Sequence, residues 1–167
     1  MADATLLHEL ISCSAERDPG AAALTYGRSS LTYAELQDAV SRFASGLLDL
    51  GLQRGERVAI YLEKRFETVI ASFGAPFAGG VFVPLNPLLK PEQVGYILRD
   101  CGVRVLVTSN ERHALLASVL PNCHDLRQVI LLDSDQAGPD GAGLNIRSWR
   151  SLLDAPSRPG HRVIDTD

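Results

Sequence analysis

Two adjacent basic residues, Lys64 and Arg65, stand where a ligand could bind. They follow a β-branched run over residues 57–62 that predicts a buried strand. Open α/β sheets bind ligands at the carboxyl ends of their strands, so these cations could attract an anionic substrate there. Lysine and arginine are mostly exposed, however, and a solvated charged junction would give the same pattern. We favour the solvated junction.

The cysteines and histidines offer one pairing that could be nucleophilic. Cys123 is followed by His124, but neighbours in a chain usually point apart, so we interpret Cys123 as an ordinary loop or buried thiol. The other cysteines, Cys13 and Cys101, are distant, and no zinc-binding spacing appears. The histidines are His8, His113, His124 and His161. An odd number of scattered cysteines is typical of a reducing compartment, and we expect a cytoplasmic location.

The acidic residues do not form a recognisable site. Asp133, Asp135 and Asp140 lack the ordered ligand spacing of a calcium loop, and we expect them in a solvated loop. Glu35 stands three residues after Thr32, which is the spacing of a helix capping box. No Ser, His and Asp set can be assembled. We therefore assign no catalytic, cofactor-binding or metal-binding residue from the sequence.

The glycines are misplaced for holding a nucleotide. Phosphate normally binds where a glycine-containing turn leads from a strand into a helix. The junctions at 63–65 and 108–110 contain no glycine. Gly79-Gly80 follows a helix, whose carboxyl end repels phosphate, so we expect a helix cap there. Gly141-Ala142-Gly143 follows a loop, and no G-x-x-x-x-G-K-[ST] motif occurs.

The overall composition is that of an ordinary globular protein. Hydrophobic residues make up 46% of the 167 residues and charged residues 22%, with a net charge of −4. A nucleic-acid-binding surface would normally be basic, so we expect no nucleic-acid partner. No signal peptide is visible. Residues 68–89 carry no charge, but glycines and prolines interrupt them, so we expect no transmembrane segment.

The elements that would position these side chains alternate between helix and strand. Apolar strands separated by amphipathic helices predict an α/β fold with a mainly parallel sheet covered by helices on both faces. In the first part of the chain we expect a helix over 6–11, a hairpin over 22–33 turning at Gly27, a helix over 33–48 ended by Gly51 and a strand over 57–62. There follow a helix from Phe66 that bends or ends at Pro76, a buried strand over 81–83, a helix from Pro91 closed by Gly102 and a strand over 103–109. In the last part we expect a helix capped by Ser109 or Asn110 through Leu120, a strand over 128–133, a loop over 134–144 and a short helix containing Trp149.

Four segments, in this order and spacing, resemble the N-terminal part of the adenylate-forming ligases. They are "LTYAEL", "L-G-x-x-x-G-E-R-V-A-I", "A-G-G-V-F-V-P-L-N-P" and "YIL-x-D". This superfamily contains acyl-CoA synthetases, nonribosomal-peptide adenylation domains and luciferases. Asn86-Pro87, where peptide synthetases tend to carry Asp-Pro, is similar to the acyl-CoA ligases. The stretches "YLEKRFE" and "NPLLKPEQV" resemble the subgroup associated with exosortase and exopolysaccharide gene clusters.

The resemblance implies an ATP-dependent ligase that works in two steps. A carboxylic acid, here a fatty acid, reacts with ATP to give an acyl-adenylate and pyrophosphate, assisted by Mg²⁺, and coenzyme A then takes the acyl group. The family's phosphate loop, T-S-G-[ST]-T-G-x-P-K, is absent, and neither Lys64 nor Lys90 has the context of its catalytic lysine. Pro76 also departs from the plain helix of most members.

We expect residues 1–167 to be the N-terminal portion of the large N-terminal domain of an acyl-CoA ligase. Such a piece would be inactive alone, would bind no cofactor itself, and would have the remaining ligase domain docked on it. One alternative is a stand-alone, non-catalytic α/β binding module on the same scaffold, since a fold does not dictate function. A Rossmann-type nucleotide-binding domain is the third reading, and the misplaced glycines oppose it.

Overall fold

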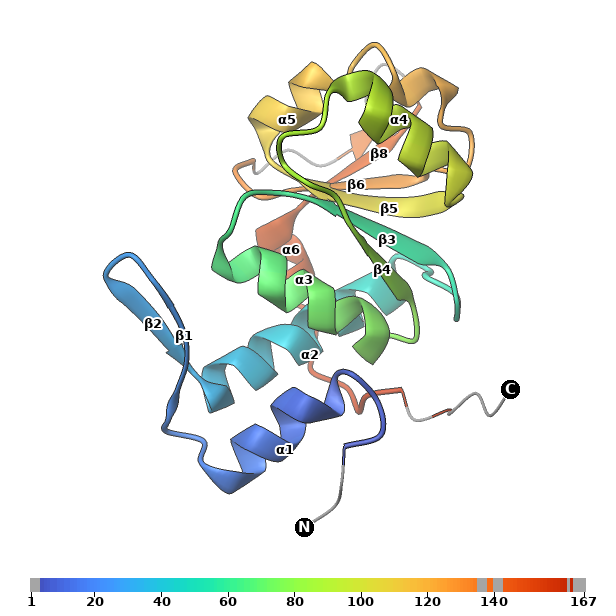
Figure 1. Cartoon of the computed structure of the whole chain (residues 1–167). Helices are drawn as coiled ribbons and strands as arrows, with labels where there is room; N and C mark the ends of the chain where they lie inside the picture. The colour runs from blue at the N-terminus through green and yellow to red at the C-terminus, as the bar shows by residue number, and fades with distance from the viewer. Residues whose placement is uncertain (1–3, 135–137, 140–142, 162, 164–167) are drawn as a thin grey trace.

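A six-stranded sheet forms the centre of the molecule (Figure 1). The computed structural model describes residues 4–134, 138–139, 143–161 and 163. The strand order is β4-β3-β5-β6-β8-β7, and all neighbours are parallel except β7 and β8. The strands are β3 (Arg57–Tyr61), β4 (Val81–Pro84), β5 (Val103–Thr108), β6 (Gln128–Leu131), β7 (Gly138–Pro139) and β8 (Asn145–Ser148).

Helices cover both faces of this sheet, as the sequence predicts. One face packs on α2 (Tyr33–Asp49), α3 (Phe66–Phe77) and α6 (Trp149–Leu153), and α1 (Glu9–Arg17) lies against α2. The other face packs on α4 (Pro91–Asp100), on Leu116 at the end of α5 (Asn110–Leu115) and on the short helix η1 (Leu120–Asn122). In β3, Val58 and Ile60 face the first layer, while Ala59 and Tyr61 face the second. Both sides of the strand are therefore buried, which explains its continuous apolar sequence.

The longest helix, α2, has the cap and the buried stripe that its sequence predicts. The Thr32 hydroxyl accepts from the Glu35 N–H, and the Glu35 carboxylate accepts from the Thr32 N–H at 2.8 Å, which completes the capping box. Phe43 is fully buried and stacks on Trp149 of α6 with 4.7 Å between ring centroids. Gly51 follows the helix with a φ of +84°, a conformation that favours glycine.

Gly79 and Gly80 close α3, as expected. The Gly80 N–H donates to the Ala75 carbonyl and the Gly79 N–H to the Pro76 carbonyl, and Gly79 has a φ of +84°. This pattern is a Schellman cap. The helix continues one residue beyond Pro76.

The expectation of a buried strand over residues 81–83 was wrong. β4 forms an edge of the sheet in this chain, with β3 on one side only, so Val81 is 48% exposed. The Val81 and Leu85 N–H groups bond toward β3, so the backbone groups of Phe82 and Pro84 face the open edge, while the Phe82 side chain packs against the core. Pro84 has no N–H, so this edge is poorly suited to accepting another strand.

Other elements also differ from the sequence prediction. The first helix begins at Glu9, and Leu7 and Leu10 are largely exposed. The helix capped by Ser109 ends at Leu115, followed by turns and η1. Strand β8 follows the expected 134–144 loop, and the sequence prediction missed both it and β7, which falls inside that loop. Residues 135–137 and 140–142 of that loop lie outside the described residues.

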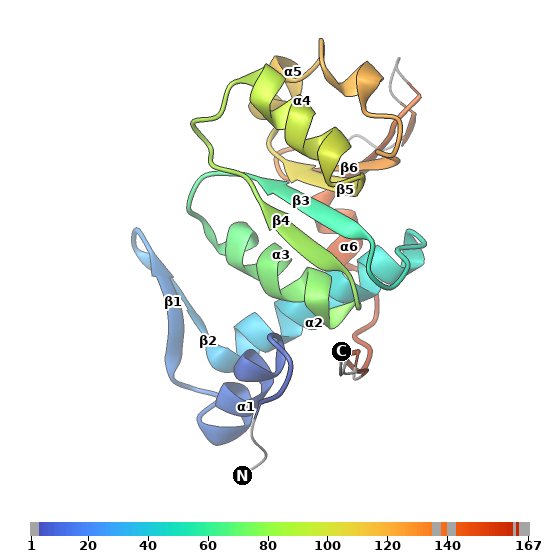
Figure 2. The ribbon, with the colours of Figure 1, turned by 45° about the vertical axis from the view of Figure 1, so that its right-hand side comes forward.

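The hairpin of β1 (Ala22–Tyr26) and β2 (Ser29–Thr32) stands apart from the main sheet (Figures 1 and 2). Gly27 occupies its turn with a φ of +62°. None of its strand residues is fully buried. Within the described residues, no helix combines the length and apolar character needed to cross a membrane.

Candidate functional site

The structure places Lys64 and Arg65 at the carboxyl edge of the sheet, directly after β3. Arg65 Nε lies 2.9 Å from Glu67 Oε2, and its Nη2 lies 3.9 Å from Asp133 Oδ1 beyond β6. These contacts raise the pKa of Arg65, chiefly through the hydrogen bond to Glu67. Lys64 is exposed and has no hydrogen bond or ion pair to the described part of the chain. The two cations therefore differ: Arg65 is held by carboxylates and Lys64 projects into solvent.

Arg112, in α5, is the cation that organises this edge, and sequence reasoning did not select it. Its Nε donates to Glu63 Oε1 at 2.9 Å, and its Nη1 donates to the Pro87 carbonyl at 2.7 Å. The guanidinium carbon lies 4.7 Å from the centroid of the Tyr61 ring. Arg112 thus ties the segment after β3 to the segment after β4.

The charges around Arg112 are matched. Burial opposes the charged form of its guanidinium, but the hydrogen bonds and attraction of Glu63 outweigh it and the pKa of Arg112 is raised. The same hydrogen bonds hold the pKa of Glu63 below its usual value. Because these donors are already used, Arg112 has little capacity left for an external anion. Arg112 lies in the first turn of the helix that follows β5, so its position shortly after a strand could have marked it as a candidate, as it did Lys64 and Arg65.

The described segments at this edge lack the glycine turn that commonly holds phosphate. The segment after β3 contains no glycine, and its Glu63 carbonyl accepts from the Thr68 hydroxyl at 2.6 Å. After β5, Ser109 caps the N-terminus of α5, and the Asn110 side-chain amide donates to the Asp133 carbonyl at 3.0 Å. Among the residues that the structure describes, no three His, Cys, Asp or Glu side chains cluster in a way that could hold a metal.

The other residues that the sequence singled out, such as Cys123 and Glu35, have contacts that explain them as structural residues. Cys123 is buried, with Sγ 3.5 Å from the Val119 carbonyl and 3.8 Å from that of Gly95, and burial raises the pKa of its thiol. His124 is exposed, so the neighbouring pair does not form a nucleophile and base. Glu35 belongs to the capping box, where hydrogen bonds from Thr32 lower its pKa. Asp135, Asp140, Gly141 and Ala142 lie outside the described residues.

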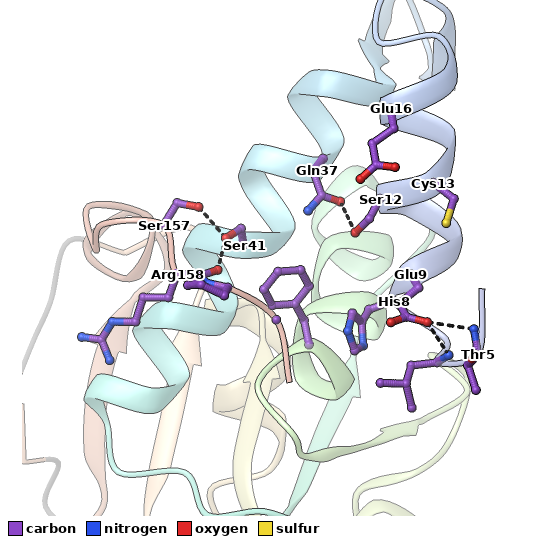
Figure 3. Close-up of a pocket in the computed structure, with 14 residues that line it drawn as sticks. Thr5, His8, Glu9, Ser12, Cys13, Glu16, Gln37, Ser41, Ser157 and Arg158 are labelled. Atoms are coloured by element: carbon purple, nitrogen blue, oxygen red, sulfur yellow. Dashed lines mark hydrogen bonds between the residues drawn. The ribbon is translucent and has the colours of Figure 1, made fainter. Parts of the chain in front are cut away.

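A cleft of about 550 Å³ lies between α1, α2 and residues 157–160 (Figure 3). His8 in this cleft is only 3% exposed and packs on Phe77, with 4.9 Å between ring centroids. Ser12 of α1 donates to Gln37 of α2 at 3.1 Å across it. Sequence reasoning did not reveal this cleft, because three segments distant in the chain build it.

Comparison with known proteins identifies a sequence family and relatives that share it. The sequence profile described as "AMP-binding enzyme" matches residues 12–159. Tyrocidine synthase 3 of Brevibacillus parabrevis is 35% identical over 141 residues, which cover 83% of this chain and 2% of that protein. Surfactin synthase subunit 2 of Bacillus subtilis (strain 168) is 34% identical over 118 residues, covering 68% of this chain and 3% of that protein.

Solved structures share the fold. Coronafacic acid ligase from Pectobacterium brasiliense superposes with a TM-score of 0.86 at 18% identity, covering 98% of this chain and 32% of that chain. A benzoate CoA ligase from Burkholderia xenovorans LB400 superposes with a TM-score of 0.77 at 24% identity, covering 98% of this chain and 31% of that chain. The chain therefore spans about a third of these structures, and 2% and 3% of the two synthases.

Proposed function

The chain belongs to the AMP-binding enzyme family, and we propose that it is the N-terminal portion of the large domain of an ATP-dependent acyl-CoA ligase. The profile match over residues 12–159 supports membership of the family, and Asn86-Pro87 in place of Asp-Pro favours the acyl-CoA ligases within it. The proposed protein converts a fatty acid and ATP into an acyl-adenylate and pyrophosphate, and then exchanges AMP for coenzyme A. Mg²⁺ assists the first step by offsetting the charge of the phosphates. A cytoplasmic location is part of the same proposal.

In this proposal residues 1–167 supply scaffold, and the chain alone is inactive. The carboxyl edge of the sheet offers no glycine turn for phosphate, and Arg112 is engaged by Glu63 and the Pro87 carbonyl. Stabilisation of the transition state would then depend on groups that these residues do not provide.

We also propose that the remaining ligase domain docks on this portion. The hairpin of β1 and β2 supports this, because its strand residues are exposed or only partly buried and Tyr26 at the end of β1 is 56% exposed. Exposed apolar side chains support it as well, with Leu88 87% and Tyr96 61% exposed.

A second candidate is an amino-acid adenylation domain of a peptide synthetase. The 35% identity to tyrocidine synthase 3 favours it. Asn86-Pro87 in place of Asp-Pro favours the acyl-CoA ligase, as does the resemblance to the exosortase-associated subgroup. A non-catalytic binding module on the same scaffold would retain the fold and lack both activities.

Two measurements test the proposal. The purified chain, incubated with ATP, Mg²⁺ and a panel of fatty acids, should release no pyrophosphate, and clear turnover would refute its inactivity. The coding sequence after Asp167 should contain a T-S-G-[ST]-T-G-x-P-K motif, whereas a stop codon there would favour the binding module. The protein encoded by the whole reading frame should then form hydroxamates from fatty acids and consume coenzyme A. Activity with amino acids instead would favour the peptide synthetase.

A further inference from the structure

Two buried serines of α2, one helical turn apart, use their hydroxyl groups differently. The Ser45 hydroxyl donates to the Ser41 carbonyl at 2.9 Å, which is the usual local bond of a serine inside a helix. The Ser41 hydroxyl leaves its own helix. It lies 2.5 Å from the Ser157 hydroxyl and donates to the Arg158 carbonyl at 3.0 Å. Ser41 is only 4% exposed, so α2 buries a polar group whose partners are distant in the sequence.

Residues 157–161, which we call the strap, are held at two further points. Arg158 Nη2 lies 2.6 Å from Asp49 Oδ1 near the end of α2. The His161 N–H donates to the Phe77 carbonyl at the end of α3 at 2.9 Å. Between them, the backbone of Gly160 lies close to His8 and Phe77, because a Cβ added there would lie 3.1 Å from both His8 Nε2 and the Phe77 ring.

The strap forms the wall of the 550 Å³ cleft opposite α1 (Figure 3). In Figure 3, Ser157 and Ser41 point toward each other, while the Arg158 guanidinium extends away from the cleft. His8 lies between the strap and α1 and is 3% exposed. The burial of His8 therefore depends on the strap staying in place.

We propose that the strap is a latch, anchored by the Ser41 hydroxyl, whose release opens the cleft and exposes His8 without unfolding the sheet. The strap carries polar bonds and an exposed ion pair, whereas the sheet buries continuous apolar strands on both faces. Segments with few buried apolar contacts open at lower free energy than the core, so the strap should open locally. Ser41 acts here as a positioning residue for residues 157–161.

The test compares three variants of the whole chain: Ser41→Ala, Ser157→Ala and, as a matched control, Ser45→Ala. Acylation of each histidine by diethyl pyrocarbonate is followed by peptide mass spectrometry. Hydrogen exchange of the His161 amide is followed by NMR. We expect Ser41→Ala to raise both rates about tenfold and Ser157→Ala about threefold, because the first variant loses two hydrogen bonds and the second loses one. His124 is exposed and should react equally in all proteins.

Ser45→Ala should leave the His8 and His161 rates at the wild-type value, because its hydroxyl bonds only within α2. Equal His8 rates in wild type, Ser41→Ala and Ser157→Ala would overturn the proposal. An equal rise in Ser45→Ala would also overturn it, since the effect would then be a general weakening of α2. If Ser41→Ala fails to fold by circular dichroism, Ser157→Ala decides the question, because Ser157 is exposed and its loss spares the core.

Discussion

Replacing Gly46 by alanine should destabilise the protein, although helix propensity alone predicts the opposite. Gly46 lies inside α2, where alanine is favoured over glycine by about 1 kcal/mol. In the folded chain, a Cβ at this position would lie 2.8 Å from the Leu152 carbonyl oxygen and 2.9 Å from Leu152 Cβ. Gly46 is therefore a point of close approach between α2 and α6, with no room for a methyl group.

The size of this loss in stability depends on whether the atoms around Gly46 can move to make room for a methyl group. The obstructing atom is a backbone oxygen in α6, and Leu152 and Trp149 of that helix are both buried. Because a backbone atom lies under 3.0 Å from the added methyl group, the cost should fall in the upper part of the range for overpacked cores, about 2–3 kcal/mol. After subtracting the gain in helix propensity, we expect a net loss of about 1–2 kcal/mol. For a chain of this size, the melting temperature should fall by about 2–8 °C.

Urea unfolding, monitored by Trp149 fluorescence and by circular dichroism, measures this change through the midpoint at constant m-value. Gly20→Ala is the matched control, because a Cβ there meets only Asp18 Oδ1 at 4.0 Å. We expect the control to stay within about 0.5 kcal/mol of wild type. A Gly46→Ala protein as stable as wild type, or more stable, would refute the close approach of α6 to α2.

The remaining predictions concern the capping box and the carboxyl edge. Thr32→Ala should cost about 1 kcal/mol in urea unfolding by removing the hydroxyl that caps α2. Thr25→Ala, which removes an exposed hydroxyl from the hairpin, should have little effect. Glu63→Gln should reduce stability at pH 7 by less than about 1 kcal/mol, since Glu63 is half exposed. Arg112 lowers the folded pKa of Glu63, so its stabilisation is present above the unfolded pKa and lost as pH falls through the folded one. The difference between Glu63→Gln and wild type should therefore shrink as the pH falls below the ordinary glutamate pKa of about 4.3, and a difference that does not shrink between pH 5 and pH 3 would contradict this account.

Features that depend on neighbours in the chain could be predicted well. The capping box of Thr32 and Glu35, the left-handed turn at Gly27 and the closure of α3 by Gly79 and Gly80 all follow from local backbone chemistry. The alternation of apolar strands and amphipathic helices likewise predicted a parallel sheet covered on both faces. The four quoted segments placed the chain in its family, which the profile match over residues 12–159 supports.

Features that depend on which segments meet in space could not be predicted. Residues 81–83 are apolar enough for a buried strand, but β4 has a neighbour on one side only and Val81 is exposed. Nothing in the order of residues showed that Arg112 would bond Glu63 and the Pro87 carbonyl, or that Ser41 would bond the strap.

The sequence by itself therefore determined most of the helices and strands, the caps of α2 and α3, and the family of this protein. Periodicity and capping are properties of a few consecutive residues, whose geometry the backbone fixes. The tertiary structure alone decided the edge of the sheet, the engagement of Arg112, the tight approach at Gly46 and the anchoring of residues 157–161 by Ser41. Each of these depends on contacts between residues distant in the chain, and only packing of the whole fold brings such residues together.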